Sequence, residues 1–427
     1  MSENKKVLDR RKVIKFILVG GAAVGVSIFG VSEVMRSLKN AMSASSTTSQ
    51  ITSTPGASTS SSKPPTTSKS TTKSTSPATT SSTTSATSST QASSDTVTQN
   101  TSSGSTSAPG VNNVPWSNLR GVCYVWQTIV FSPDGPNGPD PSVGFPLMRN
   151  NGFNLARFDD VGCWGLIDQN PSAYLQNVDY LASQADASGV SLIIQSAFGD
   201  AAQQPLELRT INGVTSSANF YNNWWNNVDY QSAGGTNPAY FGMTMWEAGF
   251  TATWKRIIPV LEKHPSVIAY SLHNEPQSFP AASNQSGILK SYYTYMSQQI
   301  RALGSSKLIS IEGTQTGQSP NVSSVLPSSY GPFVYDIHYP TAANLQTMFN
   351  NCQSLGITGW MGENFPSNIE TLLSQLKQYG FPSTAYRFTE SDSDSYSMLT
   401  SSGQPKSSTA TLASRESQTL GAAEFFV

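Results

Sequence analysis

The chain has 427 residues, of which 12% are charged, and its formal net charge at pH 7 is −1. From Val114 onward, 14 Lys and Arg stand against 22 Asp and Glu, and this net charge of −8 disfavours nucleic acid as a partner. Three cysteines without CxxC spacing, together with only three histidines, argue against a structural zinc site. The cysteines allow at most one disulfide, whose pairing the sequence leaves open: Cys123, Cys163 and Cys352.

Residues 1–42 have the pattern of an export signal or a membrane anchor. Basic residues, among them Arg10 and Arg11, precede the uncharged run 16–32. Residues 9–15 resemble a twin-arginine signal, and an ordinary dibasic signal start is the alternative. A cleaved signal would release the protein, whereas an uncleaved run would anchor it. In both cases we expect an extracellular location, with the protein secreted or tethered to a membrane or cell wall.

Residues 43–113 are mostly Ser and Thr with scattered Pro, Gly and a few Lys. So few apolar residues cannot offset the entropy of ordering the chain, and Ser/Thr runs with Pro are typical of an O-glycosylated stalk. We therefore expect a disordered linker here, followed by one folded domain over residues 114–427. That length is normal for an α/β barrel.

The folded domain alternates strand-like and helical patterns, the rhythm of a parallel sheet. Eight such strands predict a (β/α)₈ TIM barrel with its active site at the carboxyl ends of the strands. Residues 200–241, rich in Asn, Tyr and Trp, are expected to form an insertion over the mouth. The predicted strands are 119–124, 153–158, 190–195, 267–273, 308–312, 333–338, 357–362 and 384–388, and the predicted helices include 173–188, 243–263, 287–303, 342–355 and 368–378.

Two predicted strands end in a glutamate. Asn274-Glu275-Pro276 follows the fourth strand, and Gly362-Glu363-Asn364 follows the seventh. A retaining glycosidase needs two such carboxyl groups, one to protonate the leaving oxygen and one to attack the anomeric carbon. A helix cap for Glu275 and a rim salt bridge for Glu363 are the structural alternatives.

Alternation of side chains along a strand predicts where these glutamates point. In the fourth strand the bulky residues Ile268, Tyr270 and Leu272 should face the helices, which directs Glu275 toward the barrel axis. In the seventh strand Met361 and Glu363 should share the inward face, while Trp360 should face the helices. Both carboxylates then reach the same rim of the barrel.

The strand order, with Asn-Glu-Pro ending the fourth strand and Gly-Glu ending the seventh, resembles glycoside hydrolase family 5. The resemblance implies a retaining enzyme, in most members an endo-β-1,4-glucanase or a β-mannanase. It implies that Glu275 is the acid/base and Glu363 the nucleophile, and that Asn274 hydrogen-bonds the sugar 2-hydroxyl. Glu312, which ends the fifth strand, is a rival nucleophile of lower rank.

Three further residues take positions that the family uses around the nucleophile. Arg157 resembles the arginine that keeps the nucleophile ionised, with an ion pair to Asp159 or Asp160 as the structural alternative. His338 resembles the histidine of the sixth strand, with a buried core histidine as the alternative. Tyr339 is the candidate for the tyrosine beside the nucleophile.

The sequence also departs from the family pattern. A histidine after the third strand is missing, and Gln195 or Asp200 stands in its region. The family's tyrosine lies two places after the strand-six histidine, where this chain has Pro340, and the tryptophan that ends strand eight is replaced by Phe388 at best. These differences leave the sugar specificity open.

Sugar rings stack on aromatic side chains, and Trp126, Trp164, Trp224 and Trp225 lie in or near loops that can reach the rim. Trp126 and Trp164 are the predicted platforms, because they follow the first two strands. The expected function is hydrolysis of cellulose or mixed β-glucan by an endo-β-1,4-glucanase. A β-mannanase and a non-catalytic polysaccharide-binding protein are the alternatives, and the oligomeric state is not predicted.

Overall fold

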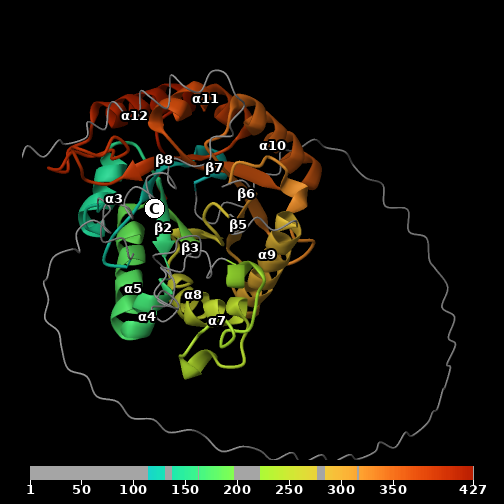
Figure 1. Cartoon of the computed structure of the whole chain (residues 1–427). Helices are drawn as coiled ribbons and strands as arrows, with labels where there is room; N and C mark the ends of the chain where they lie inside the picture. Colours follow the sequence, from blue (N-terminus) through green and yellow to red (C-terminus); the bar gives the residue numbers. More distant parts are fainter. Residues whose placement is uncertain are drawn as a thin grey trace, which may run out of the picture. The chain divides into compact units, whose positions relative to one another are not determined.

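The computed structural model describes residues 114–129, 137–161, 163–196, 222–276, 284–314 and 317–426. The predicted signal or anchor (1–42) and the predicted linker (43–113) lie outside these residues. Eight parallel strands form a closed barrel in which each strand pairs with the next and β8 pairs with β1 (Figure 1). The (β/α)₈ prediction is confirmed. The strands are β1 (Arg120–Tyr124), β2 (Leu155–Val161), β3 (Ser191–Ser196), β4 (Val267–Ser271), β5 (Leu308–Glu312), β6 (Phe333–His338), β7 (Thr358–Asn364) and β8 (Ser383–Phe388).

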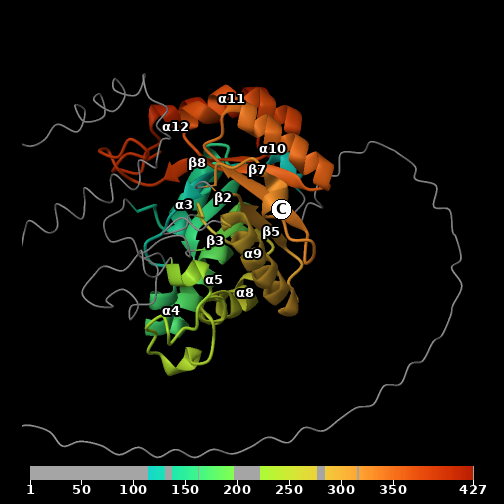
Figure 2. The same cartoon turned by 45° about the vertical axis from the view of Figure 1, so that its right-hand side comes forward.

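Helices cover the outside of the barrel, and α11 packs beside α12 in both views (Figure 1 and Figure 2). Within the described part of the chain, none of them has the length and apolar character needed to cross a membrane. The α-helices of the domain include α3 (Pro141–Asn150), α4 (Trp164–Gln169), α5 (Pro171–Ser188), α7 (Met245–Ala252), α8 (Trp254–Leu261), α9 (Gln285–Ala302), α10 (Ala342–Leu355), α11 (Pro366–Tyr379) and α12 (Ser407–Leu420).

Local signals set where the helices begin and end. The Asn170 side chain accepts the Ala173 N–H at 3.2 Å at the start of α5, and Gly189 ends that helix at φ 68°, in the left-handed region that glycine favours. The prediction of a single helix over 243–263 is wrong. Thr253, at φ −116° and ψ −86°, breaks it into α7 and α8, and its hydroxyl donates to the Gly249 carbonyl at 2.7 Å.

The lower part of the barrel interior is apolar and includes Trp360, contrary to the expectation that this ring faces the helices. Its indole N–H donates to Ser310 Oγ at 2.8 Å, and because β5 and β7 are not neighbours, this bond crosses the interior. Met361 instead packs in the outer core. Asp336 pairs with Trp360, but His338 pairs with Glu363, so β7 has one residue more than β6 in this stretch. This bulge shifts the alternation and brings Glu363 back to the mouth.

A similar shift changes the start of β4. The β3–β4 register slips between Leu192 and Ile193, and Ile268 lies with Ala269 in the same buried cluster as Trp360 instead of facing the helices. Tyr270 and Leu272 face the outer core as expected. The three cysteines are free thiols, and all three are buried.

The bond between Ser310 and Trp360 predicts energetic coupling across the barrel. Ser310→Ala should lower the free energy of unfolding by about 1–3 kcal/mol, because it leaves a buried indole N–H unpaired. In the Trp360→Phe background the same change should cost much less. Urea unfolding of the four proteins of this double-mutant cycle measures the coupling.

Ser271→Ala is the matched control for this cycle. Ser271 is also fully buried and lies on β4, but its hydroxyl has no hydrogen-bond partner among the described residues. Its removal should leave the stability unchanged or raise it. Additive effects of Ser310→Ala and Trp360→Phe would show that Trp360 does not reach across the barrel.

Candidate active site

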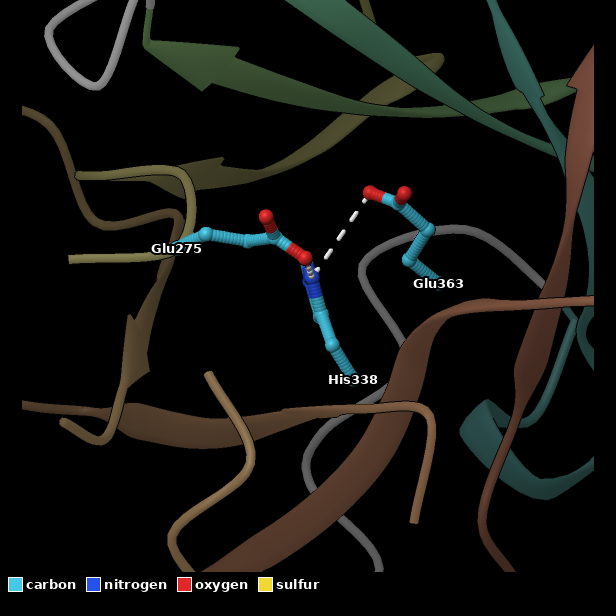
Figure 3. A group of neighbouring side chains, drawn as sticks. All are labelled: Glu275, His338 and Glu363. Carbon is cyan, nitrogen blue, oxygen red and sulfur yellow. Dashed lines mark hydrogen bonds and ion pairs between the residues drawn. The ribbon is translucent and has the colours of Figure 1, made fainter. Parts of the chain in front are cut away.

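Glu275 and Glu363 come together at the carboxyl ends of β4 and β7. Figure 3 shows both side chains directed at the His338 imidazole, whose Nδ1 lies 3.2 Å from Glu275 Oε1 and 3.6 Å from Glu363 Oε2. A carboxylate oxygen of one glutamate and one of the other lie within 4.8 Å. Retaining glycosidases hold their two carboxyl groups about 5–5.5 Å apart and inverting ones about 6.5–9.5 Å apart, so this spacing fits the retaining class.

Arg157 on β2 connects the residues around Glu363. It is fully buried, and one amino group donates to Asp159 and lies 3.4 Å from Glu363 Oε2. The other amino group donates to Asn274 Oδ1 at 2.8 Å. The predicted position beside the nucleophile and the alternative ion pair with Asp159 therefore both hold, while the Asp160 side chain lies outside the described residues.

Burial dominates the charge state of Glu363. Burial and the neighbouring Glu275 raise the pKa of this carboxyl group, His338 and Arg157 lower it, and the net result is a pKa of about 7. Arg157 thus favours the ionised form of Glu363 as expected, but its effect on the pKa is smaller than that of burial. Near pH 7 this carboxyl group exchanges between its acid and its ionised form.

Tyr339 lies beside Glu363, although Pro340 occupies the position where the family has its tyrosine. Its backbone turns at φ 44° directly after β6, and its hydroxyl donates to Glu363 Oε1. Burial and the neighbouring Glu363 carboxylate raise the pKa of Tyr339 well above its ordinary value. The phenol therefore stays protonated and remains a donor to Glu363.

His338 joins the two glutamates at the mouth to a second pair of carboxyl groups below them. Its Nε2 lies 3.5 Å from Glu312 Oε1 and 3.6 Å from Asp336 Oδ2, and the ring is fully buried. Burial opposes the imidazolium, but the carboxyl groups of Glu312, Asp336 and Glu275 outweigh it and raise the pKa of His338 well above its ordinary value. His338 is therefore both a buried histidine and a partner of the acid pair.

Glu312, the rival nucleophile, lies beneath the mouth. Its side chain is fully buried, and burial raises its pKa to about 8. Its Oε2 accepts the backbone N–H of Glu275 at 2.7 Å, at the point where Glu275 takes a left-handed φ of 45°. Glu312 thus holds the turn that aims Glu275. The sequence indicated only that Glu312 ends the fifth strand, and no sequence signal indicated this contact.

The donor sets for a metal ion overlap this network. Glu275, His338 and Glu363 form one group with the spacing of metal ligands, and Glu312, Asp336 and His338 form another. Arg157 lies 3.4 Å from the Glu363 carboxylate and 3.5 Å from that of Glu312, so a fixed positive charge opposes a cation in either group. The family resemblance implies neither a metal nor an organic cofactor, and that expectation stays a prediction.

The prediction that Trp126 and Trp164 are sugar platforms is wrong, because both side chains are buried. Trp126 is 7% exposed and packs against Tyr180 of α5, and Trp164 is 1% exposed. The Trp164 ring stacks on Tyr230 at 5.8 Å and meets the edge of Tyr240, both from the predicted insertion. Neither indole has a face open to a sugar.

Other departures also have a place in the structure. Phe388 is buried against Tyr124 in the outer core, so it cannot replace the missing tryptophan of strand eight. Gln195 is buried and donates to the Ser196 carbonyl, and Asp200 lies outside the described residues. Within the part of the insertion that is described, Trp224 packs on His273 with ring centroids 5.0 Å apart, one residue before Asn274.

A closed (β/α)₈ barrel with two carboxyl groups this close at its mouth is typical of glycoside hydrolases. The model of the cellulase family, glycosyl hydrolase family 5, matches residues 125–395, well over half of the chain. The protein therefore belongs to this family, and the resemblance seen in the sequence is confirmed. No curated protein sequence matches the chain.

Among solved structures, the chain is similar to endoglucanases and mannanases at low sequence identity. A broad-specificity endoglucanase from an uncultured bacterium is 15% identical with a TM-score of 0.50, covering 71% of this chain and 94% of that one. An endoglucanase from Pseudomonas stutzeri is 15% identical with a TM-score of 0.48, covering 72% and 96%. A mannanase from a Streptomyces species is 15% identical with a TM-score of 0.46, covering 71% and 85%.

The charge balance at Glu363 predicts how Arg157 sets the pH dependence. A carboxyl group acts as a nucleophile only when it is ionised, so with Glu363 in the role that the family resemblance implies, kcat/KM should rise with pH through its pKa of about 7. Arg157→Gln removes a cation that lowers this pKa, and the acid limb should move to higher pH. Arg256→Gln, which breaks an ion pair with Asp168, is the control that should leave the limb in place. An acid limb unmoved in a folded Arg157→Gln protein contradicts this account.

Glu312 should affect turnover through the position of Glu275. Glu312→Ala removes the acceptor of the Glu275 N–H, and a displacement of a reacting group by about 1 Å can cost about 100-fold in rate. We expect kcat to fall while KM changes little. Glu312→Gln keeps a carbonyl acceptor and should retain most of kcat. Steady-state kinetics of both variants, with folding checked by circular dichroism, decides the point, and equal kcat in both variants would refute the positioning role.

Proposed function

We propose that the protein is a retaining β-glycosidase that hydrolyses β-1,4-linked polysaccharide, with endo-β-1,4-glucanase as the favoured activity. The observation that carries this proposal is that one carboxylate oxygen of Glu275 and one of Glu363 lie within 4.8 Å of each other at the barrel mouth. Membership of the cellulase family supports the reaction class. The β-1,4-mannanase alternative shares the same chemistry and differs only in the sugar accepted.

In the first step, Glu363 attacks the anomeric carbon while protonated Glu275 gives its proton to the glycosidic oxygen. The carbon–oxygen bond breaks, the free end of the chain leaves as an alcohol, and a glycosyl ester forms on Glu363. In the second step, Glu275 takes a proton from water as that water attacks the anomeric carbon. Hydrolysis of the ester returns Glu363 as a carboxylate and Glu275 as an acid.

Neighbouring groups prepare both glutamates for these roles. Tyr339 donates to Glu363 and leaves the other carboxylate oxygen, 3.4 Å from Arg157, on the side of His338. Asn274 is oriented because its carbonyl oxygen accepts from Arg157, so its amide N–H groups are the donors directed to the sugar 2-hydroxyl. Hydrogen bonds to that hydroxyl strengthen as the transition state forms.

A non-catalytic polysaccharide-binding protein is the alternative of a different class. A binding protein has no need to bury a carboxyl group beside a second one, because its charge then costs free energy, and Glu363 is 7% exposed with a pKa near neutrality. The geometry therefore favours catalysis. We also propose secretion or tethering to the cell surface, which rests on the basic and uncharged pattern of residues 1–42 and the Ser/Thr-rich linker 43–113.

The purified full chain should release reducing sugar from one of carboxymethyl-cellulose, mixed β-glucan or mannan, and the preferred polymer names the activity. Glu275→Gln and Glu363→Gln should each reduce that activity by at least about 100-fold, because each removes a group that takes part in bond cleavage. Glu370→Gln on α11 is the control. Binding to a polymer without cleavage by the wild type would establish the binding-protein alternative.

The same digestion, followed by NMR on a soluble oligosaccharide, reads the configuration of the product before it mutarotates. The spacing of Glu275 and Glu363 predicts that the β-anomer appears first, since two displacements restore the configuration. Initial release of the α-anomer would show an inverting enzyme and would exclude Glu363 as a nucleophile.

A further inference from the structure

A band of four aromatic rings extends from Glu363 over the carboxyl ends of β6, β7 and β8. Tyr339 donates to Glu363, and its ring centroid lies 4.9 Å from that of Phe365. The Phe365 ring stacks on Tyr396, with centroids 5.0 Å apart and planes at 19°. Tyr386 lies 6.1 Å from Tyr396 and completes the band. Unlike Trp126 and Trp164, which are buried, all four residues retain some exposed surface.

Tyr396 is the most exposed ring of the band, at 36%. Single exposed aromatic residues are common on protein surfaces and need no function. This one differs because it continues, through Phe365 and Tyr339, to the carboxylate that the proposed mechanism uses. A ligand that reacts at Glu363 and extends outward along β7 and β8 therefore meets it.

The loop that carries Tyr396 is fixed to the end of β8. The Asp394 carboxylate accepts the Tyr396 N–H at 2.8 Å and also pairs with the Arg387 guanidinium at 2.8 Å. The Arg387 backbone N–H donates to the Tyr396 carbonyl at 2.9 Å. Phe365 then sets the plane of the ring. A ring held in this way loses little conformational freedom when a ligand binds, which favours affinity.

We propose that Tyr396, backed by Phe365, is a stacking platform for a sugar ring of the polysaccharide, outside the unit that Glu363 attacks. The CH-rich face of a pyranose packs on an aromatic face. The two charged groups beside the loop, Asp394 and Arg387, pair with each other at 2.8 Å, which favours a neutral ligand over a charged one. The inference rests on the proposed function. It assigns to the β7 and β8 loops the role that the sequence had given to Trp126 and Trp164.

The test compares long and short substrates in the full chain. Tyr396→Ala should lower kcat/KM about tenfold on cellohexaose or mannohexaose, whichever the wild type cleaves, because one stacking contact is lost. Hydrolysis of an aryl β-glycoside that is too short to reach the platform should be unchanged. Tyr396→Phe keeps the ring and should restore the long-substrate rate.

Tyr330→Ala is the matched control, since Tyr330 is 39% exposed and precedes β6, at the opposite end of the barrel. It should behave as the wild type on both substrates. An equal loss on long and short substrates after Tyr396→Ala would show damage to the loop, and no loss on either would show that no sugar meets the ring. Both results would overturn the platform.

A binding measurement separates failure of the platform from failure of the proposed function. If the wild type cleaves no oligosaccharide, calorimetric titration with cellohexaose and mannohexaose still measures binding. Weaker binding by Tyr396→Ala together with full binding by Tyr396→Phe would retain the platform in a non-catalytic protein. Equal binding by all variants, or no binding of either sugar to the wild type, would overturn it.

Discussion

The site depends on one buried cation. Arg157 is removed from water inside the barrel, and a guanidinium in such a place is tolerated only where carboxylates and hydrogen-bond acceptors surround it. It contacts Asp159, Glu363 and Asn274 at the same time. The groups that stabilise the buried guanidinium therefore include the proposed nucleophile and the amide proposed to bind the sugar. The imidazole of His338 is a second buried group of this kind, because it lies between the carboxyl groups of Glu275 and Glu312. Removing either cation would leave carboxyl groups crowded without compensation.

Two local departures from regular backbone bring the glutamates to this network. Glu275 turns at a left-handed φ, where its N–H reaches Glu312, and Glu363 follows a bulge that reverses the alternation of β7. Regular strands would direct one carboxyl group correctly and turn the other toward the helices. Irregular backbone at the rim of a barrel is a common way to redirect a side chain at a functional site.

The sequence predicted the architecture well because its signals are local. The strands over 308–312 and 333–338 have the predicted bounds, since short apolar runs between turns leave little choice. The glutamates were found because they end strands and match a family motif. Trp360 was placed on the wrong face because alternation along one strand does not reveal a bulge, which depends on the register of its neighbour.

Errors at the rim have a different origin. Trp126 and Trp164 follow strands and have the right chemistry, but residues more than 50 positions away cover them, as Tyr180 and Tyr230 do. Burial by distant segments cannot be read from position in the chain. The role of Glu312 was missed for a related reason, since its contact to Glu275 spans β4 and β5 and depends on a backbone turn.

The barrel interior is divided into an apolar floor around Trp360 and a charged upper layer around Arg157. These layers place stability and activity under separate control. Replacement of buried charges by well-packed apolar residues often makes a protein more stable. Selection for thermal tolerance alone would therefore remove charged residues from the upper layer, and the proposed activity would be lost with them. The floor has no such conflict. An engineered thermostable form should therefore be sought through Trp360 and its neighbours, because the buried charges of the proposed catalytic site also keep the fold below its greatest attainable stability.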